Sequence, residues 1–281
     1  MSSVDRIIRR ALEEDIGTGD ITTDGTIDAS LFSSAAITAK EEAIVSGIVI
    51  AQRTFETVDP MIKFVPLVRD GDTAQEGEVI ADLTGRASSL LKAERCALNF
   101  LMRLSGIATL TRAFVKAIEG TGAVLLDTRK TTPGLRTLEK YAVKTGGGTN
   151  HRFGLFDGVL IKDNHIEAAG GIGNAVKAMR RAAPYHKIEV EVRTIGELRE
   201  AMLAGADIVM LDNMPAEAME QAIATAKGKV LIEVSGNVTL ENIRGIAQLG
   251  PDFISTGAIT HSAKAIDISM KLTTIYTKEK L

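Results

Sequence analysis

The sequence lacks several features that mark common classes of protein. Its 281 residues include a single cysteine, Cys96, so no internal disulfide can form, and no CxxC or Cys/His pair indicates a zinc site. Cys96 lies in an apolar helical stretch, which predicts a packed core thiol. No apolar run is long enough to span a bilayer, and the charged, amphipathic N-terminus has no apolar secretory core. A cytoplasmic location is therefore expected.

An excess of positive charge is also missing. The formal net charge is −3, which excludes a generally basic nucleic-acid binder but not a local cationic patch. The glycine-rich segment at 145–150 has neither the order of a P-loop nor that of a dinucleotide-binding turn. The turn at 70–80 resembles those of biotin and lipoyl carriers but lacks their lysine, so we interpret it as structural. The composition, 45% hydrophobic and 25% charged, is that of a globular protein.

The chain divides into two parts that differ in pattern. Residues 1–107 predict an N-terminal α/β sandwich domain, and residues 108–281 a partial barrel whose C-terminal helix can pack back on the first domain. In the first part we expect helices at 4–14 and 48–58, strands near 35–40, 61–68 and 78–84, and a long helix over 88–119 that breaks around Ser105 and Gly106.

The second part alternates regularly between apolar strands and helices. Alternation of this kind is typical of a parallel sheet covered by helices. Six strands are expected, so the fold class is α/β with an incomplete, about six-stranded parallel α/β barrel, or an open sheet. The strand segments are 123–128, 158–163, 187–192, 207–212, 230–235 and 253–258.

Polar residues end all six of these strands. Enzymes with parallel α/β folds carry their chemistry at the carboxyl ends of the strands. The strand-end groups therefore predict an active site. They are Asp127, Lys162–Asp163, Glu191, Asp212–Asn213, Ser235 and Thr256–Gly257.

Strand alternation predicts which side chains face the barrel interior. In 188–192 the apolar residues share one face, so Glu189 and Glu191 point inward, as does Lys162 on the preceding strand. A buried carboxylate needs a partner, and we favour a structural ion pair between Glu189 and Lys162. Glu191, nearer the strand end, is expected to face a ligand.

Cations are concentrated between residues 129 and 162. Seven lysines and arginines and only two acids give this segment a net charge of +5 within a chain of −3. Lys140 and Lys144 are interpreted as a solvated helix face, whereas Arg129–Lys130 and His151–Arg152 flank strand ends and glycine-rich turns. Several converging cations repel one another, which predicts a polyanionic ligand. Barrels often bind phosphate in their last two loops, here 235–237 and 255–257.

Nearly the whole chain resembles the quinolinate phosphoribosyltransferase family. The central block DTRKTTPGLRTLEKYAVKTGGGTNHRFGL (127–155) is highly specific for it. Further matching segments are ALEEDIGTGDITT (11–23), AERCALNFLMRLSGIAT (93–109), LIKDNHI (160–166), EVEV (189–192), IVMLDN (208–213) and ISTGAITHS (254–262).

The resemblance implies a homodimer that converts quinolinate and phosphoribosyl pyrophosphate to nicotinate mononucleotide, pyrophosphate and carbon dioxide with Mg²⁺. Lys130, Glu191 and Asp212 are the implied catalytic residues, and the two carboxylates are the implied magnesium ligands. The quinolinate carboxylates are implied to bind Arg129, His151, Arg152 and Lys162, with Arg95 supplied by the partner subunit. Lys130, Glu191, Asp212, Ser235, Gly236, Gly257 and His261 are implied to face phosphoribosyl pyrophosphate.

One residue departs from the family pattern, and two alternative functions remain open. Asn237 stands where many relatives have a second glycine, so the contacts of this loop with phosphate are open. The alternatives are a phosphoribosyltransferase for another pyridine carboxylate, such as nicotinate, and a non-catalytic anion-binding relative. Four cations beside Arg95 favour two carboxylates over one. The presence of Lys130, Glu191 and Asp212 argues against mere binding.

Overall fold

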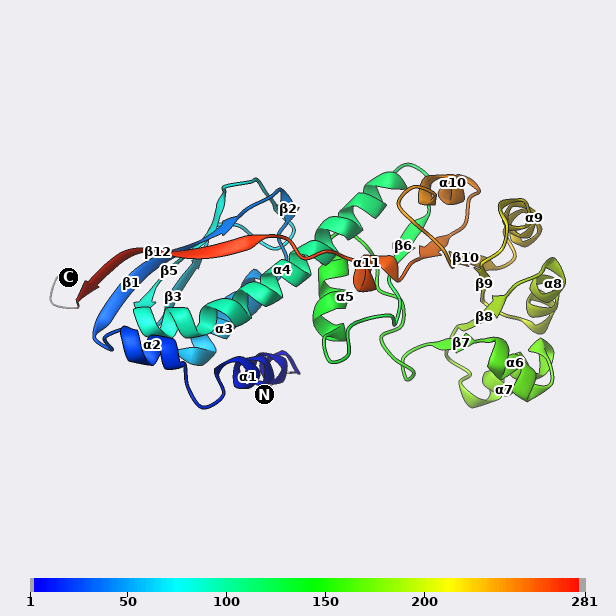
Figure 1. The fold of residues 1–281 in the computed structure, drawn as a ribbon. Coiled ribbons are helices and arrows are strands. Elements are labelled where there is room, and N and C mark those ends of the chain that lie inside the picture. The colour runs from blue at the N-terminus through cyan, green and yellow to red at the C-terminus, as the bar shows by residue number, and fades with distance from the viewer. Residues whose placement is uncertain (1–2, 278–281) are drawn as a thin grey trace. The chain divides into compact units, whose positions relative to one another are not determined.

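The computed structural model describes residues 3–277, which form two compact units (Figure 1). The first unit holds residues up to 112, residues 132–147 and residues from 263 onwards; the second holds 113–131 and 148–262. The expected α/β class is confirmed, with one antiparallel sheet and one six-stranded parallel sheet. The domain boundary between residues 107 and 108 stays a prediction. No described helix is long and apolar enough to cross a membrane.

The first unit is built on a four-stranded antiparallel sheet with the order β12-β1-β5-β3. Alternate residues of β1 are buried, and they pack with α3 and α4 in one apolar core that includes Ile37, Phe55 and Leu90 (Figure 1). Cys96 is buried in α4, and burial raises the pKa of its thiol to about 11. The elements of this unit are α1 (Ser3–Ile16), α2 (Ile21–Thr26), β1 (Leu31–Ala39), β2 (Ala43–Ile44), α3 (Ile48–Val58), β3 (Lys63–Pro66), β4 (Thr73–Ala74), β5 (Val79–Arg86), α5 (Arg136–Thr145), β12 (Ile268–Thr277) and most of α4 (Ala87–Ala117).

The C-terminal segment is a strand, and the helix expected there is wrong. β12 pairs antiparallel with β1 from Leu31 opposite Thr277 to Ala39 opposite Ile268. The segment ISMKLTTIYT is rich in β-branched residues, and its first residues alternate between buried and less buried. Without β12, β1 would be an open edge of the sheet, and the pairing satisfies the backbone groups of both strands that face each other.

The break expected in the long helix around Ser105 and Gly106 is also wrong, because α4 runs unbroken through both residues. Both are buried, and their small size serves close packing. The Ser105 hydroxyl accepts a hydrogen bond from the Ser46 amide at 3.0 Å. A Cβ atom on Gly106 would lie 1.9 Å from the carbonyl oxygen of Lys264. This glycine therefore allows a neighbouring chain segment to approach the helix.

We expect Gly106→Ala to destabilise the fold by about 1–3 kcal/mol, the usual cost of overpacking a close contact. Intrinsic helix propensity opposes this effect by about 1 kcal/mol in favour of alanine. The measurement is the free energy of unfolding in denaturant. Gly25→Ala in α2 is the matched control, because no atom lies within 4 Å of the position of its Cβ. Equal stability of the two variants would contradict the packing argument.

The second unit is a parallel sheet with the strand order β6-β11-β10-β9-β8-β7. The six predicted strands all form, and β6 and β7 are the edges of an open barrel. Helices follow most of these strands, as the alternation predicted. The elements are β6 (Val124–Leu126), β7 (Val159–Ile161), α6 (Asp163–Ala169), α7 (Ile172–Ala182), β8 (Ile188–Val192), α8 (Ile195–Ala204), β9 (Ile208–Asp212), α9 (Ala216–Ala226), β10 (Leu231–Ser235), α10 (Ile243–Gln248), β11 (Phe253–Ser255) and α11 (Ala258–His261).

Candidate active site

A pocket of about 460 Å³ lies at the carboxyl ends of the parallel strands, entirely within the second unit. The strand ends therefore converge where the sequence pattern predicted. Of the expected strand-end groups, Asp163, Thr256 and Gly257 do not line the pocket. Its lining residues are Asp127, Thr128, Arg129, Lys130, His151, Arg152, Leu160, Lys162, Glu191, Met210, Asp212, Asn213, Glu233, Ser235, Gly236, Asn237 and Ser255.

Five basic side chains line this pocket: Arg129, Lys130, His151, Arg152 and Lys162. Burial lowers the pKa of Arg152, and the nearby charge of Arg129 lowers it further. The guanidinium of Arg152 donates to the Gly158 carbonyl at 3.2 Å. Like charges gathered at one site repel one another, so an anionic ligand would stabilise this arrangement.

The ion pairs of Glu189 and Lys162 differ from the expected one. Lys162 Nζ contacts Glu191 Oε2, and Glu189 Oε2 lies 3.1 Å from His151 Nε2. The sheet register explains the difference. Glu189 is opposite Leu160, and Val190 is opposite Ile161, so Lys162 lies just beyond the paired residues, level with Glu191. Both glutamates face the interior, as the alternation predicted, but Lys162 lies two residue pairs further along the strands than Glu189 and contacts Glu191 instead.

Arg193 joins the acidic groups at the ends of three strands. Its guanidinium lies 3.0 Å from Asp163, 3.7 Å from Asp212 and 3.9 Å from Glu191. Sequence reasoning missed this residue, although a basic residue directly after strand 188–192 was a usable signal. Glu191 is buried and Asp212 is partly exposed, so two carboxylates on adjacent strands open into one pocket beside cations.

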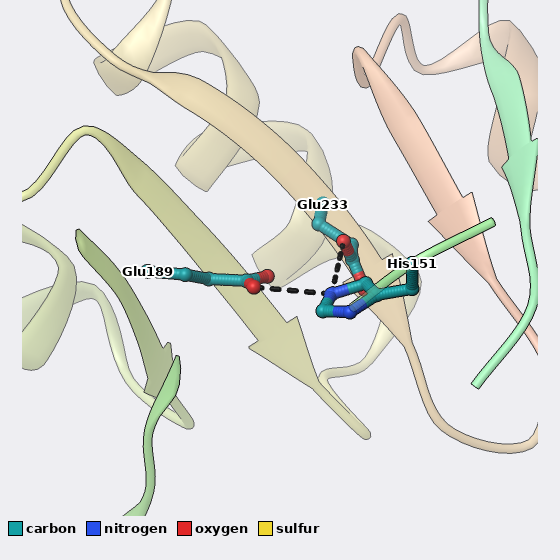
Figure 2. A group of neighbouring side chains, drawn as sticks. All are labelled: His151, Glu189 and Glu233. Carbon is teal, nitrogen blue, oxygen red and sulfur yellow. Dashed lines mark hydrogen bonds and ion pairs between the residues drawn. The ribbon is translucent and has the colours of Figure 1, made fainter. Parts of the chain in front are cut away.

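His151 lies between two buried glutamates (Figure 2). Its Nε2 atom is 3.1 Å from Glu189 Oε2 and 3.5 Å from Glu233 Oε2. Its backbone N–H donates to Asp127 Oδ1 at 2.8 Å, and its Nδ1 accepts the backbone N–H of Arg152 at 2.7 Å. Sequence reasoning missed Glu233, although an acid inside the apolar run LIEVS has the same alternation as Glu189 in IEVEV.

Burial and hydrogen bonding act in opposite directions on the pKa values of this group. Burial alone would lower the pKa of His151, but hydrogen bonds to Glu189 and Glu233 raise it above its ordinary value. The hydrogen bond from the Arg152 amide opposes protonation at Nδ1, because a protonated Nδ1 cannot accept it. Burial raises the pKa of Glu189 to about 7, while His151 lowers it and Glu233 raises it. In the neutral tautomer and in the cation alike, Nε2 carries a proton.

The loop after β10 has left-handed backbone at the position where the family pattern has a second glycine. Asn237 has a φ of 50°, a region that asparagine tolerates better than most residues. Its side-chain amide donates to Asn213 Oδ1 at 2.9 Å, and the Asn213 amide donates to Asp212 Oδ1 at 3.0 Å. Gly236, with a φ of 92°, passes so close to Asn213 that a Cβ atom would lie 2.3 Å from Asn213 Oδ1.

Lys130, Gly257 and His261 form a second group in the same unit. A Cβ atom on Gly257 would lie 2.9 Å from both the Lys130 side chain and the His261 ring, so glycine allows both to approach. The Thr260 hydroxyl donates to the Lys130 carbonyl at 2.8 Å and holds the backbone after β6. Ser235 and Ser255 end neighbouring strands, with their hydroxyl oxygens 3.0 Å apart.

Some of the predicted cations lie in the first unit. Arg95 is exposed on α4, and Arg136, Lys140 and Lys144 belong to α5. Lys144 is exposed, but the interpretation of Lys140 as solvated is wrong, because its side chain is almost fully buried. α5 also buries Leu138, Glu139, Ala142 and Val143, so more than one of its faces is covered.

Comparison with known proteins agrees with the resemblance of the sequence. The model of the quinolinate phosphoribosyl transferase C-terminal domain matches residues 107–271, and that of the N-terminal domain matches residues 20–105. A probable nicotinate-nucleotide pyrophosphorylase (carboxylating) of Bacillus subtilis is 46% identical, over 95% of this chain and 93% of that protein. A quinolinate phosphoribosyltransferase (decarboxylating) of Nicotiana tabacum is 44% identical, over 95% of this chain and 82% of that protein.

A solved structure shows the same fold. The nicotinate-nucleotide pyrophosphorylase of Francisella tularensis has a TM-score of 0.93 and 45% sequence identity, covering 96% of each chain. Two family domains together span most of the sequence, and relatives well above 30% identity cover nearly all of it. The chain belongs to the quinolinate phosphoribosyltransferase family.

Proposed function

We propose that this chain transfers the phosphoribosyl group of phosphoribosyl pyrophosphate to quinolinate and decarboxylates the product. The products are nicotinate mononucleotide, pyrophosphate and carbon dioxide, as in the synthesis of NAD. One observation carries the proposal: five basic side chains share a pocket with Glu191 and Asp212 at the strand ends. Quinolinate is a dianion and phosphoribosyl pyrophosphate a polyanion, so both match the charge of this pocket.

The residues divide into two groups in this proposal. Arg129, His151, Arg152 and Lys162 bind the two carboxylates of quinolinate, and Arg95 of the partner subunit completes the set in a homodimer. Lys130, Ser235, Gly236, Gly257 and His261 face phosphoribosyl pyrophosphate. The Lys130–Gly257–His261 group and the serines that end β10 and β11 support this assignment, since phosphate commonly binds in the last two loops of such barrels.

Glu191 and Asp212 are assigned to stabilise the positive charge that develops during the transfer. Departure of pyrophosphate leaves positive charge on the ribose, which nearby carboxylates stabilise. Loss of carbon dioxide leaves an electron pair on the pyridine ring, which the cations of the pocket stabilise until the ring carbon takes up a proton from water. Lys162, which is paired with Glu191 in this structure, is assigned to the ring carboxylates in this proposal.

Glu191 and Asp212 are also the residues that would hold Mg²⁺. Magnesium is usually bound by one or two carboxylates together with substrate phosphates and water. Two carboxylates on adjacent strands of one pocket fit this pattern. When bound, the ion would neutralise charge on the departing pyrophosphate.

The test is the release of pyrophosphate and carbon dioxide from quinolinate and phosphoribosyl pyrophosphate with Mg²⁺. We expect equimolar release from the wild type. Asp212→Ala should lower kcat by about 10²–10³-fold, the cost of removing one group that stabilises the transition state, with little loss of quinolinate binding. Glu220→Ala, an exposed change on α9, is the control. Binding of quinolinate without turnover by the wild type would support a non-catalytic relative instead.

A further inference from the structure

Glu233 and Glu189 have no part in the assignments above, yet Glu233 lines the pocket and both carboxylates are buried against His151. Glu233 is 1% exposed and Glu189 is 5% exposed. They come from β10 and β8, which β9 separates, and both point one carboxylate oxygen at the same nitrogen of His151 (Figure 2). Two buried carboxylates repel each other, so an arrangement that holds them together needs a reason.

A metal ion is the first candidate for that reason. The ligand-type atoms of His151, Glu189 and Glu233 lie within 4.8 Å of one another. A metal at Nε2 requires a free electron pair on that atom, and the ring proton would then be on Nδ1. However, Nδ1 accepts the backbone N–H of Arg152 at 2.7 Å, so Nδ1 is the unprotonated ring nitrogen and the ring proton is on Nε2. The geometry thus makes Nε2 a hydrogen-bond donor to the two carboxylates.

The hydrogen bonds of His151 extend to the next residue. The His151 amide is held by the buried Asp127, its ring is held by the glutamates, and the ring in turn holds the amide of Arg152. Arg152 then reaches the Gly158 carbonyl and lines the pocket. The orientation of two pocket cations therefore depends on one imidazole ring.

We infer that Glu233, together with Glu189, is a positioning residue that fixes the His151 ring and, through it, Arg152 for recognition of the quinolinate carboxylates. This inference rests on the proposed function. The outer oxygens of Glu189 and Glu233, their Oε1 atoms, are buried and accept no hydrogen bond from the described residues. In the described part of the chain, the side chains of Glu189 and Glu233 form ion pairs with His151 alone, so their effect should appear in substrate binding more than in stability.

The variants that test this inference are Glu233→Gln and Glu233→Leu, with Val234→Ala as the matched control. Val234 neighbours Glu233 on β10, is 1% exposed, and lies on the opposite side of the strand. Glutamine keeps an acceptor and the shape, whereas leucine keeps only the bulk. We expect the KM for quinolinate to rise about 10-fold in Glu233→Gln and up to about 100-fold in Glu233→Leu, by analogy with the roughly 10–100-fold effects of groups that orient metal-binding side chains.

The KM for phosphoribosyl pyrophosphate and the melting temperature should change little in Glu233→Gln, because a buried like charge is removed. Val234→Ala should lower the melting temperature and leave the KM for quinolinate unchanged. If the KM values for both substrates rose together in the Glu233 variants while kcat and the melting temperature fell, the role would be structural only. An unchanged KM for quinolinate in Glu233→Leu would also overturn the inference.

Nitrogen-15 NMR of the four histidines tests the geometry without any enzyme assay. We expect His151 Nε2 to carry a proton in the wild type, to keep it when Zn²⁺ is added, and to change its shift in Glu233→Leu. An unprotonated Nε2, or a shift of His151 on adding Zn²⁺, would show a metal centre and overturn the inference. If the wild type released no pyrophosphate from quinolinate, the proposed function would fail, while this measurement would still decide how His151 is held.

Discussion

Quinolinate should be used with a kcat/KM at least about 10³-fold higher than nicotinate. A site that pairs charged groups with a substrate rejects an analogue that lacks the matching group, because its own buried groups are then left unpaired. Nicotinate has one carboxylate, whereas Arg129, His151, Arg152 and Lys162 all line the same pocket. Removing the second carboxylate would leave part of this cluster without an anion.

The measurement is initial rates for both pyridine carboxylates at fixed phosphoribosyl pyrophosphate and Mg²⁺. As a control, calorimetry measures the binding of quinolinate and of nicotinate to the enzyme. This shows whether a difference in rate arises from binding or from a later step. Comparable kcat/KM values for the two substrates would contradict the quinolinate assignment and favour the nicotinate alternative.

The second large effect concerns the partner subunit. Arg95→Ala and Lys162→Ala should each be nearly inactive alone, because each removes one cation from every shared site. Arg95 is exposed on α4 in the first unit, whereas Lys162 lines the pocket of the second unit. In a symmetric dimer, one chain can supply Arg95 to the pocket of the other.

Unfolding and refolding the two variants together should restore about a quarter of the wild-type activity. Random pairing makes about half of the dimers mixed, and each mixed dimer has one site with both residues and one with neither. Lys116→Ala, an exposed change on the same helix, is the matched control and should give about half of the activity when mixed with Lys162→Ala. If mixed dimers are shown to form but the mixture stays as inactive as each variant alone, Arg95 contributes to the pocket of its own chain.

The strand pattern allowed much of the pocket to be predicted. Asp127, Lys162, Glu191, Asp212 and Ser235 were all found at strand ends, and all line the pocket. The reason is local: a strand of five residues with a period of two determines both where a side chain lies along the strand and which face it occupies. The same alternation predicted that Glu189 and Glu191 face the interior, and the structure confirms it.

Pairing between strands could not be predicted in this way. The expected Glu189–Lys162 ion pair required the register of β7 against β8, and the role of Glu233 required β8, β10 and the loop at His151 to meet. These contacts join residues 38 and 82 positions apart in sequence with His151. A local sequence pattern cannot predict such contacts, because they depend on the order of the strands in the sheet and on how many strands lie between the two partners.

The sequence alone therefore determined the α/β class, the six parallel strands, the edge of the sheet where the pocket lies and the excess of cations there. These follow from alternation, apolar periodicity and charge within short segments. Only the tertiary structure decided that Gly106 permits close approach instead of ending a helix, that the C-terminal segment completes the first sheet, that Lys140 is buried, and that His151 is held between two glutamates. Each of these depends on a neighbour distant in the chain, since packing and hydrogen bonding act through space and not along the sequence.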